Sequence, residues 1–228
     1  MEFLLLLENR RNEAPRASVS AGEIREFADQ LNAEGVLLGA IPHMQPESAA
    51  VRIRAQTGFP GQAEAPFNEP EEVATGALIV DVPDRAAAIE IAKRCPHARA
   101  GVITVRELRP PGNSLEAARS ANFVFLYLRD ETLQPPYEPK TAKMYAFTQD
   151  LVQQGIHKGG GRLPPELAGA QVERRGSRTV VVDGPFTETK EVVAGFALMK
   201  LNSRAAAIEL AQRIPHAQWG NIEIREIL

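Results

Sequence analysis

The chain contains two copies of one sequence unit. Residues 85–98 read RAAAIEIAKRCPHA and residues 204–217 read RAAAIELAQRIPHA, so the two segments agree at eleven of fourteen positions with an offset of 119 residues. Near the start of each copy, an offset of 120 residues relates Phe3 to Phe123. A period of this length is a whole domain, whereas solenoid repeats recur about every 20–50 residues. The sequence therefore predicts a tandem duplication.

The boundary between the copies lies in the segment PPGNSLEAARSA, residues 110–121. Its Pro-Pro-Gly-Asn start ends the first copy, and an Ala-rich stretch with helical character leads into the second. We therefore predict a first unit over residues 1–112, a linker over residues 113–121 and a second unit over residues 122–228.

Both units show the same order of expected elements: an apolar strand, a helix that ends at a glycine, and then a further strand, helix and strand. The expected ranges are strands Phe3–Leu7, Thr75–Val82 and 103–108 with helices Ser20–Glu34 and Arg85–Cys95, and strands Phe123–Leu128, Val192–Leu201 and 222–227 with helices Pro139–Gln154 and Arg204–Ile214. Irregular, Gly- and Pro-rich segments interrupt each unit. They carry a strand fragment at Val51–Arg54 and a hairpin made of Ala170–Arg175 and Thr179–Asp183.

This order fits an α+β fold made of two ferredoxin-like units of the split β-α-β type, in which both helices cover one face of an antiparallel sheet. The other face of each sheet would be bare. Two such units in one chain can cover both bare faces by packing sheet against sheet. We therefore expect an intrachain pseudo-dimer with a pocket between the sheets.

Composition excludes several classes of function. The formal net charge is −3 and the pI is about 5.9, without the clustered basic surface that nucleic-acid binding requires. No apolar segment approaches the roughly 18 residues of a membrane span, and Phe3–Leu7 lacks the basic start of a signal peptide. The single cysteine, Cys95, excludes an intrachain disulfide and multi-cysteine metal sites. We expect a cytoplasmic protein with no nucleic-acid or membrane partner and no cofactor.

The second unit carries a motif typical of a known family. Residues 181–191 read VVDGPFTETKE, Gly195-Phe196 follows, and residues 220–225 read GNIEIR. These residues resemble the DGPF branch of the YCII-related family, and the resemblance covers all of the second unit. The first unit follows by its similarity to the second, with the degenerate segment EAPFNEPE over residues 64–71 in place of the motif.

The resemblance implies a bacterial protein with a ferredoxin-like fold of the dimeric α+β barrel kind. Such proteins are usually homodimers, so a further homodimer of this chain stays open. Most of the family has no established activity. Members of the YCII type proper are thought to use a His–Asp pair with the His on the first helix, and one relative is a dehydrochlorinase. Genes of the DGPF branch often lie beside those of extracytoplasmic-function sigma factors. Neither first helix of this chain carries a histidine, so the dyad mechanism does not transfer.

Asp183 is the strongest catalytic candidate in the motif. A turn aspartate ordinarily accepts a hydrogen bond from the backbone N–H two residues on, but that residue is Pro185, which has no N–H. The carboxylate must therefore use a later N–H, another side chain or a ligand. Tying the turn is the simpler role, because Gly184 and Pro185 are typical turn residues.

The polar elbow after Asp183 holds four candidate binding residues, Thr187, Glu188, Thr189 and Lys190. In an extended backbone Glu188 and Lys190 would share one side and the threonines the other. Lys190 near Asp183 would suit an anionic ligand, whereas a surface ion pair of small energetic value explains it more simply.

Two further binding candidates, His157 and Arg225, are chosen for their expected positions. His157 follows the first helix of the second unit and could border a pocket. Arg225 shares with Glu223 the strand face that should look toward the other sheet, although an internal ion pair explains both equally well. His97 and His216 follow matched helix ends, where capping of free carbonyls is the simplest role. No pair of histidines has metal-ligand spacing, so no metal site is expected.

Three functions remain open. The first is a protein that binds a small molecule in a pocket near the DGPF elbow, between the sheet faces. The second is an acid–base enzyme of the lyase or isomerase type, with Asp183 as general base on a small cyclic or acidic substrate. The third is a regulatory partner of an extracytoplasmic-function sigma factor, which rests on analogy alone.

Overall fold

The structure is a computed structural model, and it describes residues 1–11, 13–54, 61–63, 72–109, 113–130, 137–164, 169–184 and 191–228. The first unit contains β1 (Glu2–Arg10), α1 (Ala21–Ala33), β2 (Leu37–Ile41), η1 (Glu47–Ala49), β3 (Val51–Arg54), β4 (Gly61–Ala63), β5 (Glu72–Asp81), α2 (Arg85–Arg94), η2 (Pro96–Arg99) and β6 (Val102–Glu107). The short helix α3 (Leu115–Arg119) joins the units. The second unit contains β7 (Phe123–Asp130), α4 (Tyr137–Gln153), β8 (His157–Arg162), β9 (Ala170–Arg175), β10 (Arg178–Asp183), β11 (Glu191–Met199), α5 (Arg204–Arg213), η3 (Pro215–Gln218) and β12 (Asn221–Glu226).

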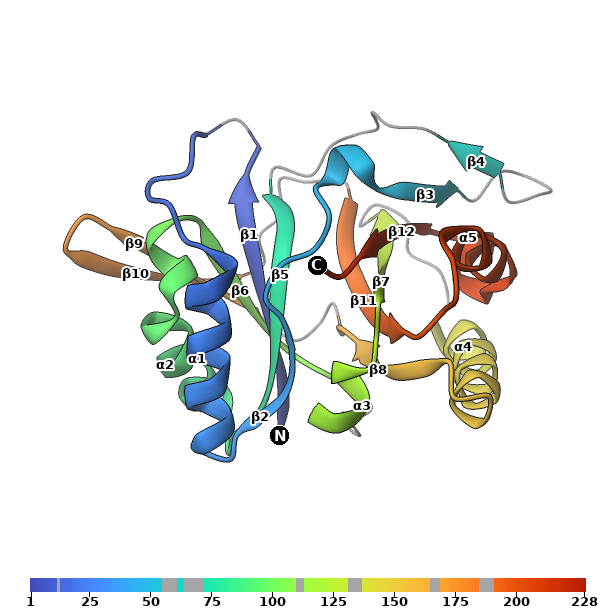
Figure 1. The fold of residues 1–228 in the computed structure, drawn as a ribbon, viewed down its shortest axis with the longest axis horizontal. Helices are drawn as coiled ribbons and strands as arrows, with labels where there is room; N and C mark the ends of the chain where they lie inside the picture. The colour runs from blue at the N-terminus through green and yellow to red at the C-terminus, as the bar shows by residue number, and fades with distance from the viewer. Residues whose placement is uncertain are drawn as a thin grey trace.

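The described strands form two antiparallel sheets of six strands, in the orders β10-β9-β6-β1-β5-β2 and β4-β3-β12-β7-β11-β8. Helices α1 and α2 cover the outer face of the first sheet, and α4 and α5 cover the outer face of the second (Figure 1). The predicted α+β class is therefore confirmed. The orders of the four strands that each unit contributes to its own sheet, β6-β1-β5-β2 and β12-β7-β11-β8, are compatible with ferredoxin-like units. In the described part of the chain, no helix combines the length and apolar character needed to cross a membrane.

The units exchange hairpins, which the sequence does not predict. Strand β3 of the first unit pairs with β12 of the second, where Arg52 lies opposite Glu223. Strand β9 of the second unit pairs with β6 of the first, where Gln171 lies opposite Thr104. Figure 1 shows the two hairpins, β3–β4 and β9–β10, reaching outward on opposite sides of the molecule. Each sheet is therefore completed by the other half of the chain.

Local sequence explains most element boundaries. Ser20 and Glu23 form a capping box at the start of α1, and Gly35 follows its end with a φ of 74°. Asp84 and Ser203 accept hydrogen bonds from backbone N–H groups at the starts of α2 and α5, as N-cap residues do.

Strands β2 and β8 lie where composition predicts irregular structure. Three glycines, residues 159–161, lie within β8, and Gly160 has a φ of 133°. A Cβ at Gly160 would lie 2.3 Å from the backbone oxygen of Phe196 on the neighbouring strand β11. Glycine therefore lets β8 approach β11 closely, and a run that resembles a loop is an edge strand.

The repeated histidines have a different role from the predicted helix capping. The ring Nε2 of His97 lies 2.9 Å from the backbone oxygen of Glu8, and that of His216 lies 2.8 Å from the backbone oxygen of Leu128. Because a carbonyl can only accept, each Nε2–H donates to it. The histidines tie η2 to β1 and η3 to β7, and they mark Glu8 and Leu128 as matching positions in the two units.

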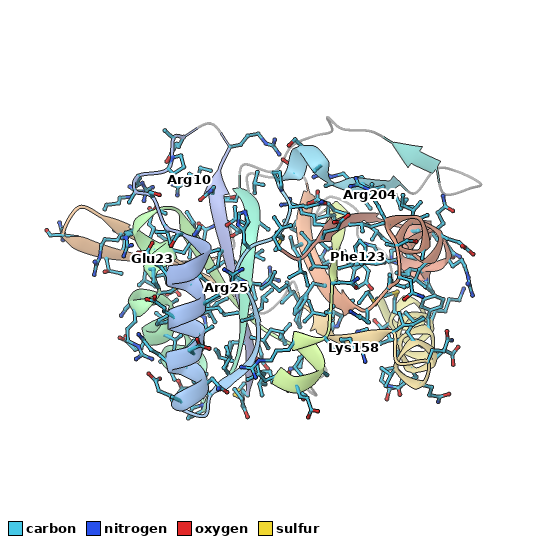
Figure 2. The ribbon with its side chains drawn as sticks, in the orientation of Figure 1. Arg10, Glu23, Arg25, Phe123, Lys158 and Arg204 are labelled. Carbon is cyan, nitrogen blue, oxygen red and sulfur yellow. The ribbon has the colours of Figure 1, made fainter. Side chains whose placement is uncertain are left out.

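The inner faces of the sheets pack against each other. Side chains along β1 alternate, so Leu5 lies in the core beneath α1 and α2 while Leu4 and Leu6 lie in a separate core between the sheets. Leu126 and Leu128 of β7 belong to the same inter-sheet core. Figure 2 shows that side chains fill the layer between the two sheets. This layer holds the pocket described below.

The variant Ile53→Ala tests the hairpin exchange. Ile53 of β3 is fully buried among side chains of the second unit. Because truncation of a buried aliphatic side chain costs about 2–5 kcal/mol, we expect the free energy of unfolding to fall by that amount in urea denaturation. The control Val181→Ala changes a side chain that is 38% exposed on β10 and should cost less than about 1 kcal/mol. A small and equal loss in both variants would contradict the exchange.

Candidate functional site

A pocket of about 100 Å³ lies between the two sheets. Its lining combines apolar side chains with a group of charged and polar ones. The apolar side chains are Leu4, Leu6, Val73, Ala74, Leu126, Leu128, Leu163, Val192 and Val193, and the polar ones are Glu8, Glu47, Arg52, Glu72, Thr104, Arg106, Gln171, Glu223 and Arg225.

A buried ion-pair network forms the side of the pocket that belongs to the second sheet. Glu223 lies at its centre and accepts hydrogen bonds from Nε of Arg52 at 2.7 Å and from Nε of Arg225 at 2.6 Å. Arg52 also donates to Glu47 at 2.8 Å, and Arg225 donates to the backbone oxygen of Ala74 on β5. The network joins the exchanged strand β3 to β12 and reaches across to the first sheet. The charged groups of this network are therefore paired with one another.

Glu8 occupies the side of the pocket that belongs to the first sheet. Its side-chain Oε2 accepts a hydrogen bond from the Thr104 hydroxyl at 2.5 Å, while the structure gives Oε1 no hydrogen-bond partner among the described residues. Burial raises the pKa of Glu8 from its ordinary value of 4.5 to about 8. The Thr104 hydrogen bond and the Arg106 charge lower this pKa, but less than burial raises it, and the Glu72 charge raises it further. Glu8 is therefore mostly protonated at neutral pH.

The pocket is asymmetric although the scaffold is repeated. Leu128 occupies the position that matches Glu8, as the histidine contacts show. Glu223 matches Thr104, because each lies on the last strand of its unit opposite the exchanged strand. One half of the pocket thus holds a carboxylate that accepts hydrogen bonds from two arginines. The other half holds a carboxyl group that accepts its hydrogen bond from a hydroxyl and, among the described residues, forms no ion pair.

Of the residues predicted from sequence, Arg225 lies in the pocket. Its side chain is 3% exposed and pairs with Glu223, so it is both a lining residue and part of an internal ion pair. Thr187, Glu188, Thr189 and Lys190 lie outside the described residues. The strand that begins directly after this elbow contributes Val192 and Val193 to the pocket wall.

Asp183 lies on the opposite face of its sheet from the pocket. It ends β10 opposite Ala170, whose side chain lies in the core beneath α1 and α2. Its own side chain is 73% exposed and forms an ion pair with Arg85 at the start of α2. The hairpin exchange thus carries Asp183 to the helix-covered side of the first sheet, and the pocket is formed without it.

His157 also lies away from the pocket lining. It is on the edge strand β8 opposite Met199, whose side chain belongs to the core beneath α4 and α5. Burial lowers the pKa of His157 to about 4, so the ring is neutral at physiological pH.

Sequence reasoning missed Glu8, Arg52 and most of the other polar lining. One signal was present for Glu8, because alternation from Leu4 and Leu6 places it on the inter-sheet face and the second unit has Leu128 there. Arg52 could not be placed, since nothing in the sequence says that β3 joins the other unit's sheet.

Among the described residues, no group of three His, Cys, Asp or Glu side chains is arranged to hold a metal ion.

The variant Glu223→Gln tests the ion-pair network. It leaves Arg52 and Arg225 buried without their shared carboxylate, and removal of one partner of a buried pair costs about 3–5 kcal/mol. We expect urea denaturation to show a loss of that size. The matched variant Thr104→Val, at the equivalent position of the first unit, removes one hydrogen bond and should cost about 1–2 kcal/mol. A loss no larger for Glu223→Gln would contradict the network.

The pH dependence of stability tests the state of Glu8. Because its pKa is about 8 in the folded protein and 4.5 in the unfolded chain, the folded state holds more protons between these values. Stability should therefore fall as pH rises from about 5 to 8, by on the order of a few kcal/mol from this residue. In parallel urea denaturations, Glu8→Gln should gain stability relative to the unmodified protein as pH rises through this window. If the difference in the free energy of unfolding between the two proteins stayed constant from pH 5 to pH 8, folding would not raise the pKa of Glu8 into this window.

Comparison with known sequences places the chain in a family. The sequence profile of the YCII-related domain matches residues 1–111 and again residues 122–228, in agreement with the tandem duplication. An uncharacterised protein of Rhizobium meliloti (strain 1021) is 37% identical over 84 residues, which cover 36% of this chain and 68% of that protein. The chain belongs to the YCII-related family and matches its domain twice.

Proposed function

We propose that the protein binds a small, uncharged molecule in the pocket between the two sheets. The observation that carries this proposal is a pocket that joins an apolar wall to hydrogen-bonding groups inside a packed layer. Ligand sites in proteins typically combine these two features. An engineered apolar cavity of about 150 Å³ in another protein holds benzene. The pocket has about 100 Å³ and is partly open to solvent, so it can enclose a molecule smaller than benzene or the inner part of a ring of that size.

Charge balance supports an uncharged ligand. Three lining carboxylates, Glu47, Glu72 and Glu223, are matched in number by three lining arginines, Arg52, Arg106 and Arg225. Glu8 adds no charge while it is protonated. The pocket therefore has no surplus charge for an ion, and a charged ligand would lose its hydration without a free counter-charge.

The proposal includes the DGPF branch of the family and an intrachain pseudo-dimer of the dimeric α+β barrel kind. The motif at residues 181–191 supports the branch. The repeated units with facing sheets support the pseudo-dimer. The pocket lies beside the strand that follows the motif, at Val192 and Val193, which agrees with a ligand near the elbow. The alternative of a sigma-factor partner draws no support from this site.

Four probes with the same ring test the proposal: cyclohexanone, cyclohexanol, cyclohexanecarboxylate and cyclohexylammonium. At pH 7 the two neutral probes should shift the backbone amide NMR signals of pocket residues such as Leu6 and Leu126. Their dissociation constants should be at least about tenfold lower than those of the two ions, which corresponds to about 1.4 kcal/mol.

Two variants control for the location of the probes. Ala74→Leu adds volume inside the pocket and should abolish binding of the neutral probes. Val181→Leu enlarges an exposed side chain on β10, away from the pocket, and should leave binding unchanged. Tighter binding of an ion, or unchanged binding to a folded Ala74→Leu protein, would contradict the proposal.

A further inference from the structure

We propose that Glu8 is a catalytic residue, a general base and acid that removes a proton from the carbon next to a carbonyl group of the bound molecule and returns it. This inference rests on the proposed function, because the ligand must occupy the pocket beside Glu8. It goes further by naming the residue, the class of ligand and the kind of reaction.

The Glu8 carboxyl group has a geometry suited to proton transfer. Glu8 is 8% exposed and lines the pocket. Thr104 holds one carboxyl oxygen, Oε2, in place, and the described residues offer no hydrogen-bond partner to the other, Oε1. A proton-transfer residue needs this arrangement, with one atom fixed by the protein and one atom within reach of the ligand.

The matching position in the second unit holds Leu128 in place of a carboxyl group. Leu128 shows that an apolar side chain fits this place in the fold and packs in the inter-sheet core with 3% exposure. A buried carboxyl group without a cation destabilises a protein relative to such a residue. Glu8 therefore has no evident benefit for folding, and groups that break a packing rule without a structural gain are typical of functional sites.

Several charged and polar groups line the pocket with Glu8. They are Glu72 on β5, Thr104 and Arg106 on β6, Gln171 on β9, and Glu47, Arg52, Glu223 and Arg225 across the pocket, while His97 contacts the backbone oxygen of Glu8 from the outer side. Arg52 and Arg225 are held by Glu223. Arg106 donates to the backbone oxygen of Pro164 at 2.9 Å, and its charge lowers the pKa of Glu8. Arg106 shares a face of β6 with Thr104 and can stabilise negative charge that develops on a ligand beside Glu8.

These features select the chemistry. An uncharged molecule gives up a carbon-bound proton to a carboxylate only if the resulting electron pair is delocalised, as it is next to a carbonyl group. The C–H bond breaks, the proton forms an O–H bond with Oε1, and the electron pair moves onto the carbonyl oxygen as an enolate. The proton on Oε1 then exchanges with solvent, and delivery of a solvent-derived proton to the same carbon restores Glu8 and gives hydrogen exchange. Delivery of the proton to the next conjugated carbon restores Glu8 and gives isomerisation. No oxidant, reductant or second substrate is needed.

The test is hydrogen–deuterium exchange at the carbons next to the carbonyl of cyclohexanone in D₂O, followed by proton NMR. The intact protein should accelerate exchange over buffer by about 10²-fold or more, and the rate should increase with pH as Glu8 loses its proton.

Glu8→Gln should lose the acceleration and still bind cyclohexanone. Glu8→Leu, which copies Leu128, should lose it and unfold at higher urea concentration than the intact protein at pH 8. Glu90→Gln changes an exposed side chain of α2, serves as the control and should exchange like the intact protein.

The outcomes separate this inference from the proposed function. Cyclohexanone that binds in the pocket without faster exchange would overturn the role of Glu8 and leave binding intact. Acceleration of exchange that is retained in Glu8→Gln would also overturn the role of Glu8. If Asp183→Asn instead loses the acceleration, the reaction would be assigned to Asp183. Absence of cyclohexanone binding would overturn both proposals.

Discussion

Packing of one sheet against the other is the constraint on which the rest of the structure depends. A ferredoxin-like unit with both helices on one side leaves a sheet face bare, and the apolar side chains of that face need a partner. The duplication supplies it within one chain, through the core that contains Leu4, Leu6, Leu126 and Leu128. This packing also removes water from around Glu8, and burial is the largest cause of its raised pKa. The fold and the candidate chemistry thus have the same origin.

Duplication within one chain also allows the two halves to differ. A symmetric homodimer must place the same residue at both matching positions, because both subunits have one sequence. Here one half carries Glu8 and Thr104, and the other carries Leu128 and Glu223 at the same places in the fold. The second half uses Glu223 with two arginines to fix the exchanged strand. The first half leaves its carboxyl group open to the pocket.

The parts of the fold that depend on neighbouring residues in the sequence, such as helices and turns, could be predicted from the sequence. The internal repeat and the glycine after α1 indicated the units and their first helices. The hairpin β9–β10 was also predicted, from its Gly176-Ser177 turn. Its destination was not, because alternation specifies which face a side chain takes and says nothing about which sheet the strand joins. Strand β8 was missed because its three glycines have the composition of a loop.

The candidate site was harder to predict, for a related reason. Turn chemistry drew attention to Asp183, but the exchanged hairpin carries it to an exposed place beside Arg85. Arg225 was identified because alternation along β12 fixes its face. Glu8 follows a run of leucines and looks like the polar end of a strand. Its burial arises only when β1 packs against the second sheet, which no local pattern reports.

The central claim is that packing between the sheets keeps the Glu8 carboxyl group protonated at neutral pH. Carbon-13 NMR of protein labelled at the glutamate side-chain carboxyl carbon measures this directly, with the Glu8 signal assigned from its absence in Glu8→Gln. We predict a titration midpoint near 8 for this signal. A midpoint near the ordinary glutamate value of 4.5 would contradict the account, because it would mean that Glu8 is solvated or paired with a cation.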